Sequence, residues 1–202
     1  MSFILSLFLC VFTLGAAAAA QEAGRQAMEP ARHRIVSADF VQIRHLTELD
    51  MEVEAHGSMI CELDGRLRWQ VDAPVKCITL IDRETLTHYD GETGRIAVIP
   101  QEKFPWLKLL RESLDDWLTG DPERLAERFE VTLPQPGKLH LIPRDAALKK
   151  FCETVDLELV PEGDAIRRFR IAEPAGDTLE IRFSEVVNSP QLPPGVWRMP
   201  TQ

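Results

Sequence analysis

Residues that could carry catalysis are scattered along this 202-residue chain and form no known catalytic motif. The sequence has no G-x-S-x-G nucleophile elbow, no glycine-rich phosphate loop, no H-E-x-x-H zinc motif and no C-x-x-C pair. Its histidines are far apart, and most have polar neighbours: His33, His45, His56, His88 and His140. Most acidic residues fall at turns or on outward strand positions. We therefore predict no catalytic residue, no metal site and no cofactor.

The cysteines could do redox chemistry only if two of them meet. Three lie beyond the first 20 residues, Cys61, Cys77 and Cys152, and their spacing matches no zinc or redox motif. An odd number allows at most one disulfide and leaves at least one free thiol. Each cysteine has apolar, strand-like neighbours, where a buried thiol acts as a small hydrophobic side chain. The sequence favours packed thiols and leaves a single disulfide as the alternative.

The side chains most suited to binding a ligand are apolar. The candidate ligand-binding residues are Met59, Leu67 and Trp69 on strands, with Trp106, Leu110 and Leu114 on a helix. Residues 104–118 carry apolar side chains at i, i+3 and i+4 spacing, with charges opposite. Such a stripe is typical of core packing. Alternatively, the helix covers a cavity for an acyl chain, which would gain about 10 kcal/mol at about 0.8 kcal/mol for each methylene.

A sheet must position these residues. From residue 37 the hydrophobic pattern has a period of two, which predicts one apolar and one polar face. Helical patterns cover 22–36 and 104–118, with a one-turn insertion at 145–150. Strands are predicted at 37–46, 51–62, 66–71, 75–81, 85–90, 95–99, 128–133, 138–142, 151–160, 165–173, 178–187 and 196–199. The predicted fold is mainly β with inserted α: a strongly curled antiparallel sheet forming a half-open β-barrel lidded by helices.

The N-terminus predicts export. Residues 3–15 form an apolar run that is too short to span a bilayer, and small residues follow it. Ala18-x-Ala20 fits a cleavage site, so residues 1–20 are predicted to be a signal peptide and 21–202 a single periplasmic domain. An uncleaved anchor is the alternative. The net charge of −9 argues against nucleic-acid binding, because phosphate would repel such a chain.

The order of these elements, and several residues in them, resemble a known family. The residues are Phe40 and Gln42 in the first strand, Gly57, Leu67, Trp69 and Pro74 in the next hairpin, Leu139, Pro143, Leu148, Phe151, Gly163, Ile166 and Phe169 in the second half, and Asn188, Leu192, Val196 and Trp197 near the end. In this order they are similar to the periplasmic outer-membrane lipoprotein carriers, the LolA family. The resemblance covers essentially all of residues 21–202. It implies a helix-lidded half-barrel that carries lipoprotein acyl chains from an inner-membrane ABC exporter to an outer-membrane receptor.

One departure from the family concerns the lid. The well-known carriers have an Arg-Pro after the second strand, and its arginine holds the lid closed. Here the corresponding residues are Leu63 and Asp64. Either Arg66 or Arg68 substitutes from nearby, or the latch is missing. The departure suggests a divergent paralogue whose cargo is another amphiphile, such as a glycolipid-like or polyene lipid.

Three hypotheses of function follow. The first is a non-catalytic, monomeric periplasmic carrier of a lipoprotein or another amphiphilic lipid. The second is a lipid-binding sensor or adaptor that regulates a partner protein, for which the acidic surface could dock onto a basic partner. The third is an enzyme acting on an envelope lipid, which requires an Asp/His pair that converges in the apolar pocket.

Overall fold

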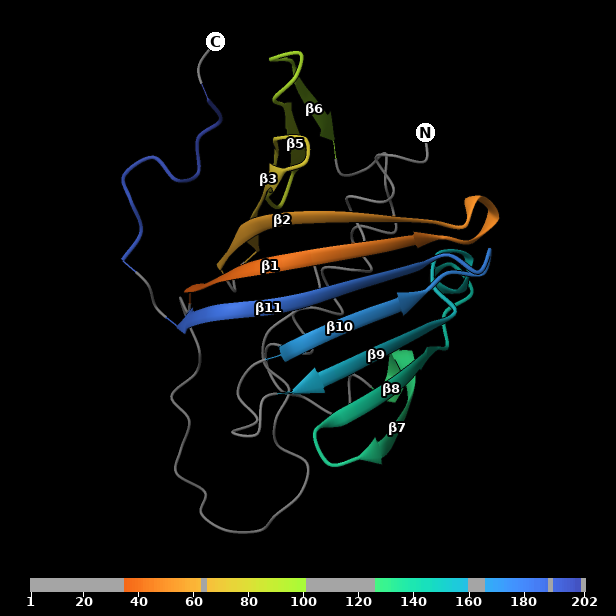
Figure 1. Ribbon diagram of the computed structural model, residues 1–202. Helices are drawn as coiled ribbons and strands as arrows, with labels where there is room; N and C mark the ends of the chain where they lie inside the picture. Colours follow the sequence, from red (N-terminus) through yellow and green to blue (C-terminus); the bar gives the residue numbers. More distant parts are fainter. Residues whose placement is uncertain (1–34, 63–64, 101–125, 160–165, 189–190, 201–202) are drawn as a thin grey trace, which may run out of the picture.

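The computed structural model describes residues 35–62, 65–100, 126–159, 166–188 and 191–200. Eleven strands account for most of them (Figure 1). The strands are β1 Ile35–Leu46, β2 Met51–Glu62, β3 Arg66–Ala73, β4 Cys77–Ile81, β5 Thr85–Asp90, β6 Ile96–Pro100, β7 Phe129–Gln135, β8 Lys138–Pro143, β9 Thr154–Leu159, β10 Ile166–Ala172 and β11 Thr178–Asn188. Two short 3-10 turns, η1 Thr47–Leu49 and η3 Leu148–Lys150, lie between strands.

All eleven strands belong to one antiparallel sheet, in the order β6-β5-β4-β3-β2-β1-β11-β10-β9-β8-β7. Two meanders, β1 to β6 and β7 to β11, join where β1 pairs with β11, so strands from both ends of the chain lie at the centre. Turn residues explain the hairpins. The Asp82 side chain accepts backbone N–H bonds at the β4–β5 turn, and that of Asp90 does so at the β5–β6 turn.

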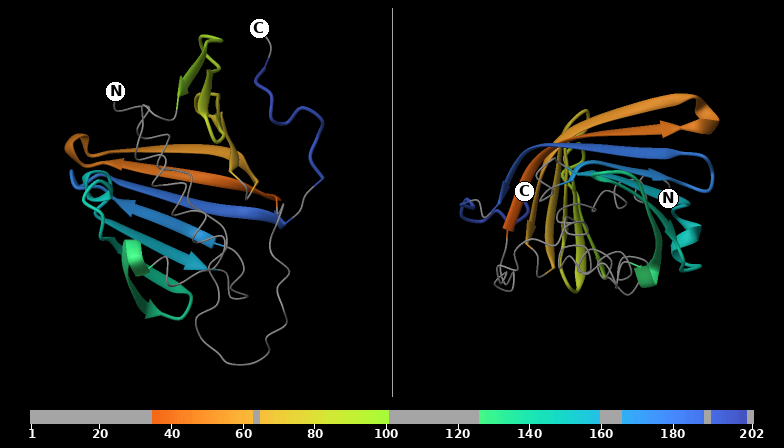
Figure 2. Two further views of the ribbon diagram at one scale, coloured as in Figure 1. Left: turned by 180° about the vertical axis from the view of Figure 1, so that it is seen from behind. Right: turned by 90° about the horizontal axis from the view of Figure 1, so that it is seen from below.

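The sheet is open, which corrects the predicted strong curl. A barrel closes only when its edge strands pair, and among the described residues β6 and β7 each pair with one neighbour. These edges are short, and the twist is spread over eleven strands. Figure 2 shows the outer strands of both halves bending toward the same side of the sheet, without closing it. The predicted lid helix over 104–118 lies outside the described residues.

The predicted strands that correspond to β1 through β11 agree with the structure to within three residues at every end, and two other predictions are corrected. Residues 35 and 36 belong to β1 and not to the predicted helix over 22–36, the rest of which lies outside the described residues. The predicted strand at 196–199 is wrong. Prolines 193 and 194 and Gly195, whose φ is +79°, favour turns, and the Val196 and Arg198 amides donate to carbonyls three residues back.

A charged cluster fastens the β1–β2 hairpin to the β10–β11 turn. The buried Arg44 side chain lies 2.8 Å from Glu173 and 3.4 Å from Asp177. The Asp177 carboxylate also accepts the Thr47 backbone N–H at 2.9 Å, and the Thr47 hydroxyl donates to the Gly176 carbonyl at 2.6 Å. Because these contacts join segments about 130 residues apart, they hold the two meanders together at this end of the sheet.

Candidate functional site

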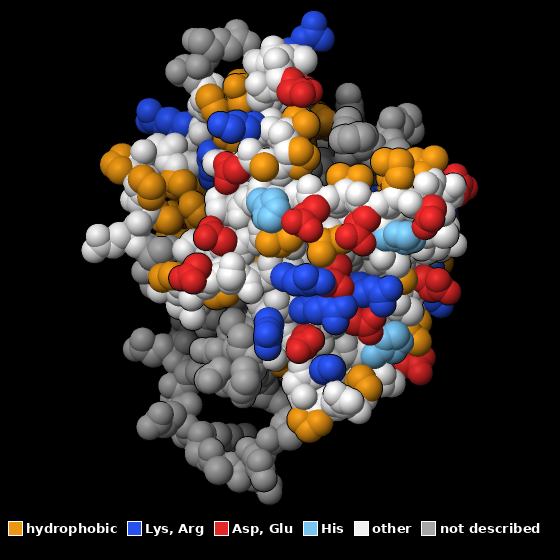
Figure 3. All heavy atoms as spheres, in the orientation of Figure 1, with side chains coloured by type: hydrophobic (Ala, Val, Ile, Leu, Met, Phe, Trp, Pro, Cys, Tyr) orange, Lys and Arg blue, Asp and Glu red, His pale blue; other side chains and the backbone are white. Residues whose placement is uncertain are grey.

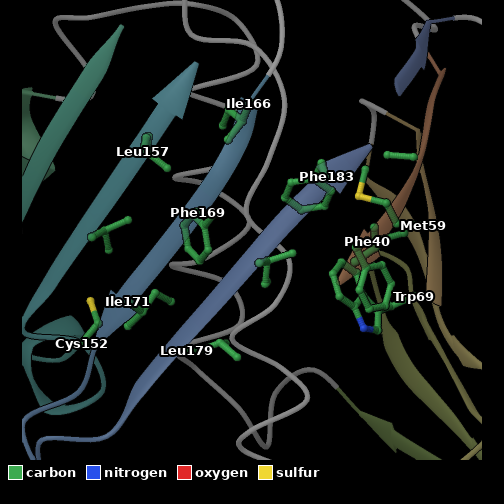
Figure 4. Packing of buried hydrophobic residues seen from close by; sticks show 14 of the residues in the cluster. Phe40, Met59, Trp69, Cys152, Leu157, Ile166, Phe169, Ile171, Leu179 and Phe183 are labelled. Atoms are coloured by element: carbon green, nitrogen blue, oxygen red, sulfur yellow. The ribbon is translucent and has the colours of Figure 1, made fainter. Parts of the chain in front are cut away.

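One face of the sheet is apolar across both meanders, and we call it the apolar face. Alternate residues of each strand point to it because side chains on a strand switch sides at every residue. Strand register places them in one continuous cluster, part of which Figure 4 shows. Its largest fully buried members are Trp69, Phe129, Phe169, Leu86, Leu141, Ile166, Ile171, Leu179 and Ile181.

Three of the predicted ligand-binding residues lie together on this face. Met59 of β2 pairs with Trp69 of β3, and Leu67 is two residues before Trp69 on the same side. All three are buried. The other three, Trp106, Leu110 and Leu114, lie outside the described residues. Ligand binding by these six residues stays a prediction.

A stacked aromatic pair occupies the centre of the β1–β3 half. The rings of Phe40 and Trp69 lie 3.8 Å apart between centroids and are nearly parallel (Figure 4). Phe40 pairs with Gly57 on the strand between them, and the missing side chain leaves room for its ring to reach Trp69. A Cβ on Gly57 would come within 2.7 Å of Phe40 Cζ and 1.9 Å of the Gln70 carbonyl oxygen. Gly57 is therefore required by close packing.

A short row of polar groups interrupts the apolar face beside this pair. Trp69, Thr79 of β4 and His88 of β5 are directly opposite one another in register, so their side chains share this face. We call these three residues the polar row. Thr79 Oγ1 lies 3.0 Å from His88 Nδ1, within hydrogen-bonding distance. Burial lowers the pKa of His88 below its usual value, although nearby Asp90 acts the other way.

The indole N–H of Trp69 is the unusual member of the polar row. Trp69 is 1% exposed, and its Nε1 atom has no acceptor among the described residues. A buried donor without a partner costs free energy, and most native structures satisfy such groups. Trp69 is one of the ligand-binding residues predicted from the sequence, whereas Thr79 and His88 are not. The alternation that places Trp69 inward, carried through the register into β4 and β5, would have found them.

The two arginines proposed as substitute latches bind the C-terminal segment, residues 195–198. Arg68 donates to the backbone carbonyls of Val196 at 2.9 Å and Arg198 at 3.3 Å. The Arg66 guanidinium lies 4.8 Å from the centre of the Trp197 ring, a cation–π contact, and also binds Glu62. Both arginines therefore hold the C-terminal segment against β3. Residues 63 and 64 lie outside the described residues.

Cys61, Cys77 and Cys152 form no disulfide with one another, which resolves the question of a disulfide among them. Cys152 is buried, Cys61 and Cys77 are half-buried, and all three are in or against the hydrophobic core. Burial raises the pKa of the Cys77 and Cys152 thiols to about 11. They therefore stay protonated at neutral pH and act as packing groups.

The opposite, polar face carries paired charges. Arg168 and Arg182 both bind Glu180, and His140 Nδ1 lies 2.6 Å from Asp156. Figure 3 shows acidic and basic side chains interspersed over this face. The His140–Asp156 pair thus points away from the apolar face. No three His, Cys, Asp or Glu residues in the described ranges are grouped so that they could hold a metal ion.

Comparison with known proteins places this geometry in a family. The family model for the outer membrane lipoprotein carrier protein LolA matches residues 32–199. The chain belongs to the LolA family. An outer-membrane lipoprotein carrier protein of Legionella pneumophila (strain Paris) is 25% identical over 159 residues, which are 78% of this chain and 75% of the relative. The family is one of carriers and not of enzymes.

Two of the solved structures that are similar to this LolA-family chain have low sequence identity to it. An uncharacterized conserved protein from Thermus thermophilus has a TM-score of 0.50 and 11% identity, covering 85% of this chain and 88% of the other. MucB from Pseudomonas aeruginosa, solved as a complex with MucA, has a TM-score of 0.49 and 14% identity. The match covers 84% of this chain but only a little over half, 56%, of that one. Within the described part of this chain, no helix combines the length and apolarity that a membrane span needs.

Proposed function

We propose that this LolA-family protein is a periplasmic carrier that binds the acyl chains of a lipoprotein, or of another amphiphilic lipid, against the apolar face. Two observations support the proposal: the family match over residues 32–199 and the continuity of the apolar face across both meanders. Burying a long acyl chain there would gain about 10 kcal/mol gross, at about 0.8 kcal/mol for each methylene. Because a bilayer stabilises the acyl chain by a comparable amount, this gain offsets the cost of leaving the donor membrane but does not by itself drive extraction.

The proposal includes the route of transport. The predicted signal peptide, residues 1–20, would export the chain to the periplasm. The protein would then move as a monomer between an inner-membrane exporter and an outer-membrane acceptor. The helix predicted over 104–118, with Trp106, Leu110 and Leu114, would serve as the lid. Release of the cargo requires that such a lid opens.

The arginine contacts support a cargo or latch that differs from those of the well-known carriers. Arg66 and Arg68 occupy positions next to the missing latch, and their side chains hold the C-terminal segment. A latch built on either arginine would have to break these contacts first. We therefore extend the proposal to amphiphiles other than lipoproteins, including glycolipid-like and polyene lipids.

The decisive experiment is extraction of the native protein. The full chain is expressed in a Gram-negative host, purified from the periplasm without detergent, and extracted for mass spectrometry of lipids. Binding of a fluorescent acyl probe is measured on the same preparation after the lipid has been removed. We expect a co-purified amphiphile and saturable probe binding. A folded protein with neither would overturn the proposal.

Substitutions in residues 104–118 distinguish whether their apolar stripe acts as a lid or packs in the core. Trp106→Asp and Leu110→Asp should each weaken probe binding at least tenfold and leave the circular dichroism spectrum unchanged. Val98→Asp is the matched control, because Val98 is 61% exposed and its side chain lies on the polar face of β6. If the two helix variants unfold while Val98→Asp does not, the stripe is core, and it is not a lid.

A further inference from the structure

The polar row places buried hydrogen-bonding groups in a part of the sheet where the surrounding face is apolar. Trp69 is 1% exposed and Thr79 3% exposed, so both are withdrawn from solvent. On the same transverse row of the sheet the neighbours are Met59 on one side of Trp69 and Ala97 beyond His88. Hydrogen-bonding groups in such a place need partners, because an unpaired buried polar group is costly.

The hydrogen bonds within the row leave donors unused. Thr79 Oγ1 and His88 Nδ1 satisfy each other at 3.0 Å. If the threonine hydroxyl donates to Nδ1, the imidazole proton is on Nε2, which is then a second N–H donor. Trp69 Nε1 has no acceptor in the described part of the chain. The row thus presents N–H donors, and a bound ligand would have to supply the hydrogen-bond acceptor.

The charges around the row determine which acceptor fits. Burial keeps the His88 imidazole neutral at pH 7 because it lowers the pKa. The Asp90 carboxyl, two residues along β5 on the same side, has a pKa held below its usual value by the Thr93 and Glu92 backbone N–H groups, so it is ionised. A carboxylate or phosphate on the ligand would lie near the negative charge of Asp90, and none of the three residues of the polar row would offer it a cation. A neutral carbonyl oxygen is not repelled by Asp90 and needs no cation, so it fits the row better.

We infer that the polar row binds the ester or amide carbonyl at the head of an acyl chain, with the Trp69 indole N–H as its donor. The inference rests on the proposed function and deepens it: the ligand class becomes acyl esters and acyl amides, in preference to ethers, hydrocarbons and free fatty acids. The chain beyond the carbonyl lies along the apolar face, next to Phe40 and Met59. Thr79 and His88 bind each other at the other end of the row.

The test compares matched ligands. Methyl dodecanoate, N-methyl dodecanamide, dodecyl methyl ether and dodecanoate compete with a fluorescent acyl probe on the lipid-free full chain. One recovered hydrogen bond predicts that the ester and amide bind about tenfold more tightly than the ether. Trp69→Phe keeps an aromatic ring for stacking on Phe40 but lacks the donor, so it should remove that preference. Trp197→Phe, a tryptophan substitution outside the sheet, should retain it.

A spectroscopic measurement on the unaltered chain gives a second readout of the same hydrogen bond. The chain has four tryptophans, so an amide correlation NMR spectrum shows four indole N–H signals, and the one missing from Trp69→Phe is assigned to Trp69. The ester should shift this signal downfield further than the ether does, because the ether has no carbonyl oxygen to accept the bond at this position. Equal affinity for ester and ether, with no movement of the signal, would overturn the inference and leave the carrier proposal standing. Failure of all four ligands and of the probe to bind would overturn the carrier proposal itself.

Discussion

Replacing Gly57 by alanine tests the packing on which the apolar face depends. The added methyl carbon would lie 1.9 Å from the Gln70 carbonyl oxygen and 2.7 Å from Phe40 Cζ. Carbon–oxygen contacts are ordinarily about 3.3 Å or longer, so the overlap with Gln70 is roughly 1.4 Å. Gln70 contributes backbone here, so no side-chain rotation relieves the clash. The strands β2 and β3 must separate, and Phe40 must leave its stack on Trp69.

We expect Gly57→Ala to lower the free energy of unfolding by about 3 kcal/mol, the upper end for overpacking in a core. For a domain of this size that corresponds to a melting temperature lower by roughly 6 to 12 °C. Urea unfolding followed by tryptophan fluorescence gives the midpoint and the slope. Without the clash, alanine in a strand would instead stabilise the chain by about 0.5 to 1 kcal/mol, because glycine loses more backbone entropy.

The control is Gly94→Ala. Gly94 has a φ of +69°, and an added Cβ would meet no described heavy atom within 4 Å. This variant therefore measures backbone strain alone, about 1 kcal/mol. Phe40→Leu should lower the stability less in the Gly57→Ala background than in the unaltered chain, since there it also relieves one of the two contacts. If Gly57→Ala is no less stable than Gly94→Ala, the close approach of β2 to β3 is wrong.

Three further predictions follow from the described contacts. Arg68→Ala should release the C-terminal segment, which would be seen as faster amide hydrogen exchange at Val196. Unchanged exchange at Val196 would contradict the role of Arg68 in holding this segment. Below about pH 6.5 the unfolded chain binds a proton at His88, but burial lowers the His88 pKa in the folded chain. The free energy of unfolding should therefore decrease as the pH falls through this range, and His88→Gln should flatten that slope. Cys77 and Cys152 should react slowly with a disulfide reagent at pH 8 and rapidly in urea, because a pKa of about 11 leaves roughly one thiol in a thousand ionised; fast labelling of the folded chain would refute their burial.

The polar row shows why pattern alone did not find the candidate site. Alternation within β3 identifies Trp69 as inward, since that rule needs only the neighbouring residues. Placing Thr79 and His88 beside it requires the register of β3 with β4 and of β4 with β5, and a shift by one residue would turn both side chains outward. The partners of Arg66 and Arg68 were equally out of reach, because the C-terminal segment is about 130 residues away in the chain.

Local periodicity by itself determined most of the strands and the apolar and polar sides of the sheet. The order of these elements, with residues such as Phe40, Gly57 and Trp69, gave the resemblance to the family that the comparison confirms. These features depend on residues close together in sequence. Only the tertiary structure decided that β1 and β11 pair at the centre, that the sheet stays open, that residues 196–199 form no strand and contact Arg68, and that Trp69 has a buried donor without a partner among the described residues. Each of these depends on contacts between distant segments. The free energy of such contacts is set by packing and register, which no local sequence pattern predicts.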